Sequence, residues 1–249
     1  LAASAARDGK RFGDEVRWRE LTQLPKHIAD MQMTTVAPMA GVRIAFSALD
    51  APVAREVEPA FAQAGIFVVS NASAFRMADD VPLLIPEVNA DHLALLARQR
   101  RERGWTGAIV VNPNCSTAAL VTAIAPLHRA YGLRKAVVAT LQAASGAGYP
   151  GVPSLDLLGN VIPLIGGEEE KIEAELRKIL GRVEGERIVE AEIVTSAMVH
   201  RVPVVDGHMV SASLAFDRAP SAEEAIATLR AFRGADPVPT LPSSPALPV

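Results

Sequence analysis

The sequence predicts an α/β chain in two parts, with a parallel sheet wrapped by helices over residues 1–114 and an α+β layer over residues 115–249. In the first part, short apolar runs alternate with segments of helical spacing, which is typical of parallel strands joined by helices. In the second part, strand-like segments follow one another without helices between them, which indicates antiparallel strands covered on one face. We place the boundary at Cys115.

Each strand of the first part is expected from a short apolar run bounded by polar or turn-forming residues. Two helices are expected between them, one ending at Gly65 as its C-cap and one starting at Asn89 as its N-cap, with arginines in the last turn before Gly104. The expected strands are residues 42–48, 66–70, 81–86 and 106–111, and the expected helices are 51–65 and 89–104.

The second part opens with an apolar helical pattern directly after Cys115, and a charged helix is expected further along the chain. Ser221 is a good N-cap for a last helix. The remaining expected elements are a strand at 133–144, a glycine-rich loop at 145–154, helices at 168–180 and 221–232, and antiparallel strands at 187–199 and 207–216.

Composition narrows the class of protein. Apolar residues make up 49% of the chain and charged residues 21%, with a net charge of −3, so neither nucleic acid nor an acidic membrane surface is an expected partner. No apolar run approaches the roughly 20 residues that cross a bilayer. A single cysteine cannot form an internal disulfide, which favours a cytoplasmic location. The scattered histidines have no ligand spacing, so we expect no metal site.

That cysteine, Cys115, lies in the segment VVNPNCSTAAL, at the junction of an expected strand and an expected helix. The positive end of a helix favours the thiolate, which is the nucleophilic form of cysteine. The free backbone N–H groups there could also hold an oxyanion formed by attack on a carbonyl. The alternative is that Cys115 is a small buried hydrophobic residue.

A second segment with reactive residue types is HRVPVVDGH, residues 200–208. Arg201 offers a planar fork that matches a carboxylate, and His208 can move a proton near neutral pH. If residues 202–205 form a strand, the Asp-Gly turn could bring His208 back toward Arg201. The alternative is a surface arginine and a hydrogen-bonded structural histidine.

Weaker signals come from three other places. Arg76 follows an expected strand, at the edge where parallel sheets bind ligands. Glu168 and Lys171 share one face at the start of a helix, and the glycines of residues 145–151 permit close approach of a ligand. The alternatives are a solvated arginine, a solvated helix start and an ordinary turn.

Taken together, the chain resembles the aspartate-semialdehyde dehydrogenase family, especially its archaeal and fungal form. Five matching segments occur in the family's order and span nearly the whole chain. They are SNASAFRMADDVPLLIPEVNADHL, NPNCSTAAL, LQAASGAGYPGVPSLD, GNVIPLIGGEEEKIEAELRKILG and HRVPVVDGHMVS. The resemblance implies an incomplete Rossmann-type parallel sheet at 1–114 and an α+β catalytic and dimerisation domain at 115–249, as in glyceraldehyde-3-phosphate dehydrogenase.

The resemblance also implies roles for matching residues. Cys115 would be the nucleophile, His208 the acid/base, Gln142 the residue that orients the substrate, and Arg201 the clamp on its carboxylate. Arg76 would bind phosphate with help from Lys171, and Glu168 would lie beside the substrate. Ser145 and Gly146 would line the nicotinamide side of the cofactor pocket.

The implied reaction is the NADPH-dependent reductive dephosphorylation of L-aspartyl 4-phosphate to aspartate semialdehyde through a Cys115 thioester. A thiolate is both a good nucleophile and a good leaving group, so one difficult step becomes two easier ones. This reaction belongs to lysine, threonine and methionine biosynthesis. The family also implies a homodimer or a dimer of dimers.

Two departures from the family pattern concern the ends of the chain. No strand with a glycine-rich pyrophosphate turn is present, and the opening segment instead resembles the part where Ser4 and Arg7 would meet the ribose phosphate of NADP. The family's last strands and final helix are also absent. We therefore expect an internal fragment of a longer protein, which would be active when complete and would bind NADP poorly as residues 1–249 alone.

Three other functions are compatible with the same residues. A malonyl- or succinyl-CoA reductase would share the cysteine and histidine chemistry on the same fold. An inactive fragment could serve only as a dimerisation module with a buried Cys115. A cysteine hydrolase is the third, although a glycine-rich loop suits a dinucleotide better.

Overall fold

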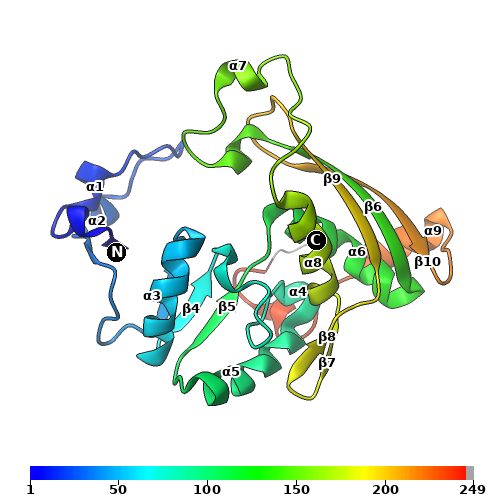
Figure 1. Ribbon diagram of the computed structural model, residues 1–249, viewed down its shortest axis with the longest axis horizontal. Helices are drawn as coiled ribbons and strands as arrows, with labels where there is room; N and C mark the ends of the chain where they lie inside the picture. The colour runs from blue at the N-terminus through cyan, green and yellow to red at the C-terminus, as the bar shows by residue number, and fades with distance from the viewer. Residues whose placement is uncertain (245–249) are drawn as a thin grey trace.

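The computed structural model describes residues 1–244, and it contains two three-stranded sheets on either side of a central group of helices (Figure 1). The first sheet is built from β3 (Ile44–Ser47), β4 (Phe67–Ser70) and β5 (Ala108–Val111), in that order and all parallel. Helix α3 (Ala51–Gln63) joins β3 to β4, and α5 (Leu95–Arg103) precedes β5. The predicted parallel strands at 42–48, 66–70 and 106–111 are confirmed.

Gly107 shows why a glycine precedes β5. A Cβ at this position would lie 2.3 Å from the Ile66 carbonyl oxygen and 2.8 Å from that of Ala62, closer than real side chains approach. The backbone of β5 therefore reaches the end of α3 and the start of β4 only because residue 107 has no side chain.

The predicted strand at 81–86 is wrong. Only an isolated parallel bridge joins Leu83 to Val111, in which Val111 N donates to Pro82 O at 3.0 Å and Leu84 N donates to Val111 O at 2.8 Å. Proline has no N–H, so Pro82 and Pro86 cannot extend the ladder in either direction.

The predicted helix at 89–104 begins later than expected. Asn89 is the last residue of α4 (Pro86–Asn89), a 3-10 turn η3 (Ala90–Ala94) follows, and α5 starts at Leu95. Asn89 is buried, accepts from Ile85 N at 2.8 Å and donates to Leu83 O at 2.8 Å. Its amide therefore holds the preceding loop instead of capping α5.

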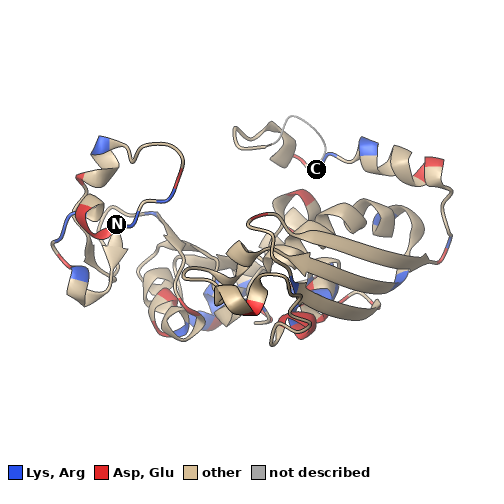
Figure 2. Cartoon of the chain, turned by 90° about the horizontal axis from the view of Figure 1, so that it is seen from above, with Lys and Arg blue, Asp and Glu red and all other residues tan. Residues whose placement is uncertain are grey.

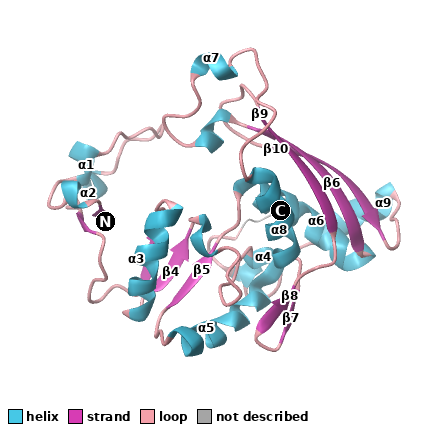
Figure 3. Ribbon diagram, viewed as in Figure 1, coloured by secondary structure: helices cyan, strands magenta, loops and turns pink. Residues whose placement is uncertain are grey.

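In the second sheet, β6 (Leu133–Gln142) lies between β9 (Val194–Arg201) and β10 (Met209–Phe216). β10 runs antiparallel to β6 as expected of residues 207–216, but β9 runs parallel to β6. The segment 187–199 contains two elements, since β8 (Arg187–Val189) pairs with β7 (Arg182–Glu184) in a separate hairpin. Figure 3 shows the three long strands side by side.

Helices α6 (Cys115–Tyr131) and α8 (Glu168–Ile179) pack beside this second sheet, and α9 (Ala222–Ala231) packs against α6. Side chains from α6, α8 and the covered faces of β6 and β9 form one core with those of the first sheet. Ser221 caps α9 through a reciprocal bond pair with Glu224, which confirms the predicted cap. The long strands of this sheet carry few charged residues and are drawn almost entirely in tan in Figure 2.

The remaining elements are short. They are β1 (Ala2–Ala3), which pairs in parallel with β2 (Thr34–Thr35), and η1 (Ala5–Arg7), α1 (Phe12–Glu15), α2 (Lys26–Ala29), η2 (Ser73–Phe75), η4 (Ala144–Ala147), α7 (Ser154–Leu157) and η5 (Val238–Thr240). Among residues 1–244, no helix has both the length and the apolar character that a membrane span requires. Those residues also contain no group of three or more side chains arranged to hold a metal ion.

Candidate active site

Cys115 is the first residue of α6, four residues after the end of β5, and its side chain is exposed. Asn114 caps the helix, because its Oδ1 accepts from Ser116 N at 2.9 Å and from Thr117 N at 3.4 Å. The sulfur therefore lies at the positive end of a 17-residue helix, and the alternative of a buried structural cysteine is wrong.

His208 lies directly beside this sulfur, with Nε2 3.2 Å from Cys115 Sγ. On the other side of the ring, Ala143 N donates to Nδ1 at 3.1 Å. A backbone N–H can only donate, so Nδ1 is unprotonated and the neutral ring carries its proton on Nε2, directed at the sulfur. Partial burial, followed by the positive charge of Arg201, lowers the pKa of His208 and keeps the ring neutral near neutral pH.

Arg201 and Gln142 end the neighbouring strands β9 and β6 and are partners in their register. Both are buried, and Arg201 Nη1 donates to Ala143 O at 2.8 Å and to Gln142 Oε1 at 3.3 Å. The expected return of the chain toward Arg201 is found, although residues 202–205 form no strand. A guanidinium at this depth is a fixed positive charge beside the nucleophile.

Gly146 explains how the glycine-rich loop approaches these groups. A Cβ on Gly146 would lie 2.6 Å from Arg201 Nη1 and 2.7 Å from His208 Cε1. Any side chain here would displace the arginine or the histidine, so the loop closes over the site only with glycine.

A cavity of about 470 Å³ brings many of the candidate residues together. Cys115, Gln142, Glu168 and Arg201 contribute polar groups, and the rest of the lining is mostly apolar or small. The other lining residues are Asn114, Gly146, Ala147, Val152, Ile162, Leu164, Ile165 and Gly166. Such a concave site with a few converging polar groups is typical of small-molecule binding.

Glu168 connects this cavity to the helix cap. Its Oε2 accepts from Asn114 Nδ2 at 2.6 Å and its Oε1 accepts from Lys171 Nζ at 2.7 Å. Burial opposes ionisation, but the hydrogen bond and charge of Lys171, with the bond from Asn114, hold the pKa of Glu168 below its usual value. Glu168 is therefore an ionised acceptor, and Lys171 lies on the helix beside it.

Arg76 does not line this cavity. It is buried, its Nη1 donates to Glu175 Oε1 at 3.0 Å, and its Nη2 donates to Asn71 O at 2.9 Å. Glu175 Oε2 in turn accepts from Asn114 N at 2.7 Å. The structure thus links Arg76 to the start of α6 through a carboxylate that the sequence did not indicate.

The candidates for cofactor binding fall in two places. Ser145 and Gly146 belong to η4 at the edge of the cavity, and Ser145 N donates to Val205 O at 3.0 Å. Ser4 and Arg7 lie in the N-terminal segment, outside the residues that line the cavity, with Arg7 exposed and 3.8 Å from Glu15.

Sequence reasoning missed Asn114 and Glu175. Asn114 could have been found, since an asparagine directly before a helical pattern is an N-cap signal. Glu175 could not, because it is one of several glutamates in a charged helix and its partners lie 61 and 99 residues away in the sequence.

Two family models match parts of this chain. Residues 1–96 match the family model of the semialdehyde dehydrogenase NAD-binding domain, and residues 124–247 match that of the semialdehyde dehydrogenase dimerisation domain. The aspartate-semialdehyde dehydrogenase of Archaeoglobus fulgidus is 51% identical over 98% of this chain and 70% of its own length. That of Methanothermobacter thermautotrophicus is 46% identical over 100% of this chain and 72% of its own length.

The chain is also similar to solved structures of aspartate-semialdehyde dehydrogenases. The aspartate-semialdehyde dehydrogenase of Candida albicans with NADP is similar at a TM-score of 0.86 and 38% identity, covering 94% of this chain and 69% of that one. Aspartate-semialdehyde dehydrogenase II of Vibrio cholerae is similar at a TM-score of 0.71 and 27% identity, covering 92% and 69%. The chain therefore belongs to the aspartate-semialdehyde dehydrogenase family.

Proposed function

We propose that this chain catalyses the NADPH-dependent reductive dephosphorylation of L-aspartyl 4-phosphate to L-aspartate 4-semialdehyde. The observation that carries the proposal is the 3.2 Å contact between Cys115 Sγ and His208 Nε2, in a chain whose relatives of 37–51% identity are named aspartate-semialdehyde dehydrogenases. The product of the reaction is a small aldehyde that carries a carboxylate, and the site combines a nucleophile with a buried guanidinium.

In this mechanism, Cys115 attacks the acyl carbon of the substrate and phosphate leaves, which forms a thioester. The Nε2–H of His208 is directed at the sulfur in the resting enzyme and would donate to the carbonyl oxygen once the sulfur has attacked. When the carbon–sulfur bond breaks after reduction, the thiolate is released and accepts the same hydrogen bond again. His208 would thus donate its hydrogen bond to whichever of the two atoms, sulfur or oxygen, carries the negative charge.

Arg201 and Gln142 would hold the amino-acid end of the substrate. Arg201 is fixed by its bond to Ala143 O, which leaves its other guanidinium nitrogen free to pair with the substrate carboxylate. Fixing the substrate in this way reduces the entropy lost on reaching the transition state. Lys171 and Arg76 would define the phosphate end, with Arg76 one layer behind the cavity, and Glu168 would lie beside the substrate.

NADPH supplies the hydride when bound, and the loop carrying Ser145 and Gly146 would hold its nicotinamide side. The fit is supported by the lining of the cavity, where Gly146, Ala147 and Val152 present small or apolar surface beside Cys115. Ser4 and Arg7 would contact the ribose phosphate. The corresponding domains would be residues 1–114 for the cofactor and 115–249 for catalysis.

A CoA-thioester reductase is the second reading of the same chemistry, and it is not favoured. The aspartate-semialdehyde dehydrogenases named above match over nearly the full chain. Assaying aspartate semialdehyde plus phosphate against malonyl- and succinyl-CoA separates the two readings directly.

Cys115→Ser tests the proposal. We expect it to lower the rate of NADP reduction with aspartate semialdehyde and phosphate by at least about 10³-fold, because a serine hydroxyl beside a neutral imidazole is not ionised. Ser116→Ala, which alters the next helical residue without touching the sulfur, is the control.

A second measurement needs no cofactor. Aspartate semialdehyde should protect Cys115 against iodoacetamide by forming a thiohemiacetal, and propionaldehyde, which lacks the carboxylate, should protect much less. Equal protection by both aldehydes, or turnover that survives in Cys115→Ser, would contradict the proposal.

The active form is proposed to be a homodimer built on the open face of the second sheet. Val137, Leu141 and Met198 are 49%, 40% and 49% exposed on that face, although they lie within regular strands. The match of residues 124–247 to a dimerisation domain supports this assignment.

A further inference from the structure

Glu175 is a buried carboxylate in the middle of α8, only 2% exposed. Its two oxygens have different partners, Arg76 Nη1 at 3.0 Å and Asn114 N at 2.7 Å. Arg76 directly follows η2, and Asn114 is the residue that caps α6. Glu175 therefore joins two segments that approach the active site from different parts of the chain.

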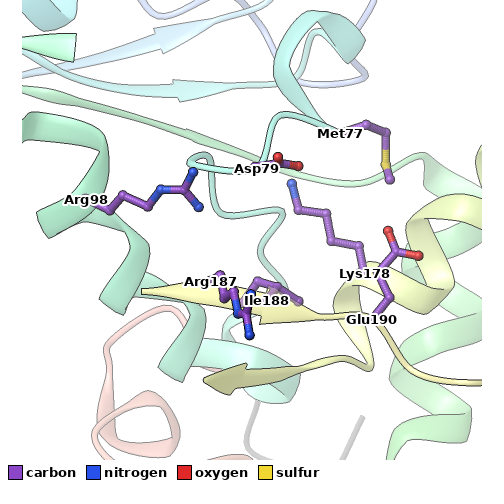
Figure 4. Close-up of a pocket in the computed structure, with 7 residues that line it drawn as sticks. All are labelled: Met77, Asp79, Arg98, Lys178, Arg187, Ile188 and Glu190. Atoms are coloured by element: carbon purple, nitrogen blue, oxygen red, sulfur yellow. The ribbon is translucent and has the colours of Figure 1, made fainter. Parts of the chain in front are cut away.

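The same helix also holds the backbone that carries Arg76. Lys178, one turn after Glu175, donates to the carbonyl oxygens of Arg76 at 2.7 Å, Ala78 at 2.7 Å and Val81 at 2.9 Å. Figure 4 shows Lys178 reaching from α8 toward the loop that carries Asp79, beside a second cavity of about 350 Å³. With its ammonium group used in this way, Lys178 acts as a support of the loop.

Asn114 is consequently held by α8 at two points. Glu168 binds its side-chain amide and Glu175 binds its backbone nitrogen. Because Asn114 directly precedes Cys115 and caps α6, the position of the sulfur depends on both carboxylates. Glu168 lines the cavity beside the sulfur, whereas Glu175 is not among the residues that line this cavity.

The Arg76–Glu175 pair is buried on both sides, with side-chain exposures of 10% and 2%. A buried pair of this kind is neutral as a unit, but removing one member leaves the other as an uncompensated charge in a poorly solvated place. The Glu175 carboxylate contacts Asn114, the residue before the thiol, and the Arg76 guanidinium lies on the other side of that carboxylate. An unpaired cation near the helix start favours the thiolate, and an unpaired anion opposes it.

We propose that Glu175 is a positioning residue of this active site, which joins the Arg76 guanidinium to the start of α6 and balances the charge next to Cys115. The role in substrate turnover rests on the proposed function, but the balance of charge can be measured without turnover. Cys115 is the only cysteine in the sequence, so alkylation by iodoacetamide reports on this one sulfur.

The experiment compares the pH profile of Cys115 alkylation in four proteins: wild type, E175Q, R76M and the double variant. We expect E175Q to move the midpoint of the profile to lower pH by about half a unit or more, since it frees a positive charge at the helix start. R76M should move the midpoint to higher pH by a similar amount, and the double variant should return close to wild type.

A matched control is E170Q, which makes the same charge change on an exposed residue of α8 and should leave the midpoint unchanged. A residue that only maintains structure would give a different result, because loosening the start of α6 lowers reactivity in both single variants. Shifts in the same direction, or no shift in E175Q, would overturn the proposal.

Folding is checked by circular dichroism before alkylation. If R76M does not fold, the direction of the E175Q shift alone decides whether the proposal holds. If the isosteric E175Q does not fold, Glu175 is needed for the structure itself and the proposal is overturned. Turnover with aspartate semialdehyde is measured in parallel. A wild type without turnover but with opposite shifts would refute the proposed function and leave the positioning role intact.

Discussion

The tautomer of His208 is set by a hydrogen bond from a backbone amide. Because Ala143 N donates to Nδ1, the ring offers its only proton to Cys115 Sγ, and Arg201 opposes a second proton on the ring. The sulfur is therefore stabilised by a neutral hydrogen-bond donor together with the end of α6, without an imidazolium partner.

Replacing His208 by alanine should lower the rate of Cys115 alkylation at neutral pH by about tenfold. The reason is the loss of one hydrogen bond to a charged acceptor, which is worth about 1.5 kcal/mol or more. His208→Gln retains an N–H donor and should recover part of the rate, and the exposed His27→Ala is the control. Equal rates in wild type and His208→Ala would show that the imidazole does not act on the thiolate.

Residue types explain which parts of the site could be predicted. Cys115, Arg201 and His208 stand in short segments whose spacing already indicated their chemistry, and the structure places all three within one site. Arg76 was singled out by its place after a strand. Its buried partner Glu175 could not be, because the pairing depends on how α8 packs beside the loop that follows η2. Local sequence carries no signal for such a contact.

At the scale of elements, helix α8 packs against the second sheet and also supports the loop 76–81. Lys178 extends from this helix to three carbonyl oxygens of the loop 76–81, and burial lowers the pKa of Lys178 to about 8. One of these carbonyls, that of Ala78, also accepts from Val81 N at 3.2 Å within the loop.

Lys178→Met should destabilise the protein by about 3 kcal/mol, since three hydrogen bonds from the ammonium group to backbone carbonyls are lost at about 1 kcal/mol each. Urea denaturation measures the change in the free energy of unfolding. Lys26→Met, which removes only an exposed pair with Asp30, should change stability by less than about 0.5 kcal/mol. A similar loss in both variants would contradict the supporting role of Lys178.

A second buried titratable group, the imidazole of His92, lies in η3 and makes the stability of the fold depend on pH. His92 is fully buried, with Nδ1 3.0 Å from Asn89 Nδ2 and Nε2 3.2 Å from Gly181 O. Both ring nitrogens are used by the neutral form, and burial is the main reason that the pKa of His92 lies below 6.5. Protonation would remove the acceptor that Asn89 needs.

Stability should consequently fall as the pH decreases below about 6.5. In that range the unfolded chain binds a proton at residue 92 and the folded chain does not, so the unfolded state is favoured as the pH falls toward the lowered pKa. Urea denaturation between about pH 7 and 5.5 measures the slope, and His92→Gln should be less stable at neutral pH with a shallower slope. An unchanged slope in His92→Gln would show that His92 does not titrate in this way.

Element order was easier to predict than strand neighbours. Apolar runs located β4, β5 and β6, but nothing in the local pattern of β9 or β10 shows that β6 separates them. The same limit applies to residues 81–86, whose apolar character suggested a strand although two prolines allow only one bridge. Sequence pattern reports burial, whereas strand pairing depends on which backbone groups can donate.

At the scale of the whole molecule, the second sheet is covered on one face only. α6 and α8 bury one side, and the other side presents aliphatic residues alternating with serines and alanines. Val137 faces Ser196 on β9 and Ser213 on β10 in the strand register, so a second copy could approach the strands closely there. A stable interface of standard size buries about 800 Å² on each partner.

Val137→Asp combined with Met198→Asp should convert a dimer in solution into a monomer. Both changes place a carboxylate in the middle of the proposed interface, where burial without a partner costs several kcal/mol, enough to raise the dissociation constant by more than about 100-fold. Sedimentation velocity over a range of concentrations gives the mass of each species. Leu21→Asp, which adds a charge at a fully exposed apolar residue of the N-terminal segment, should leave the wild-type mass unchanged. If the double variant kept the dimer mass, the subunits would have to meet through another surface, and the open face of β6, β9 and β10 would need a different occupant.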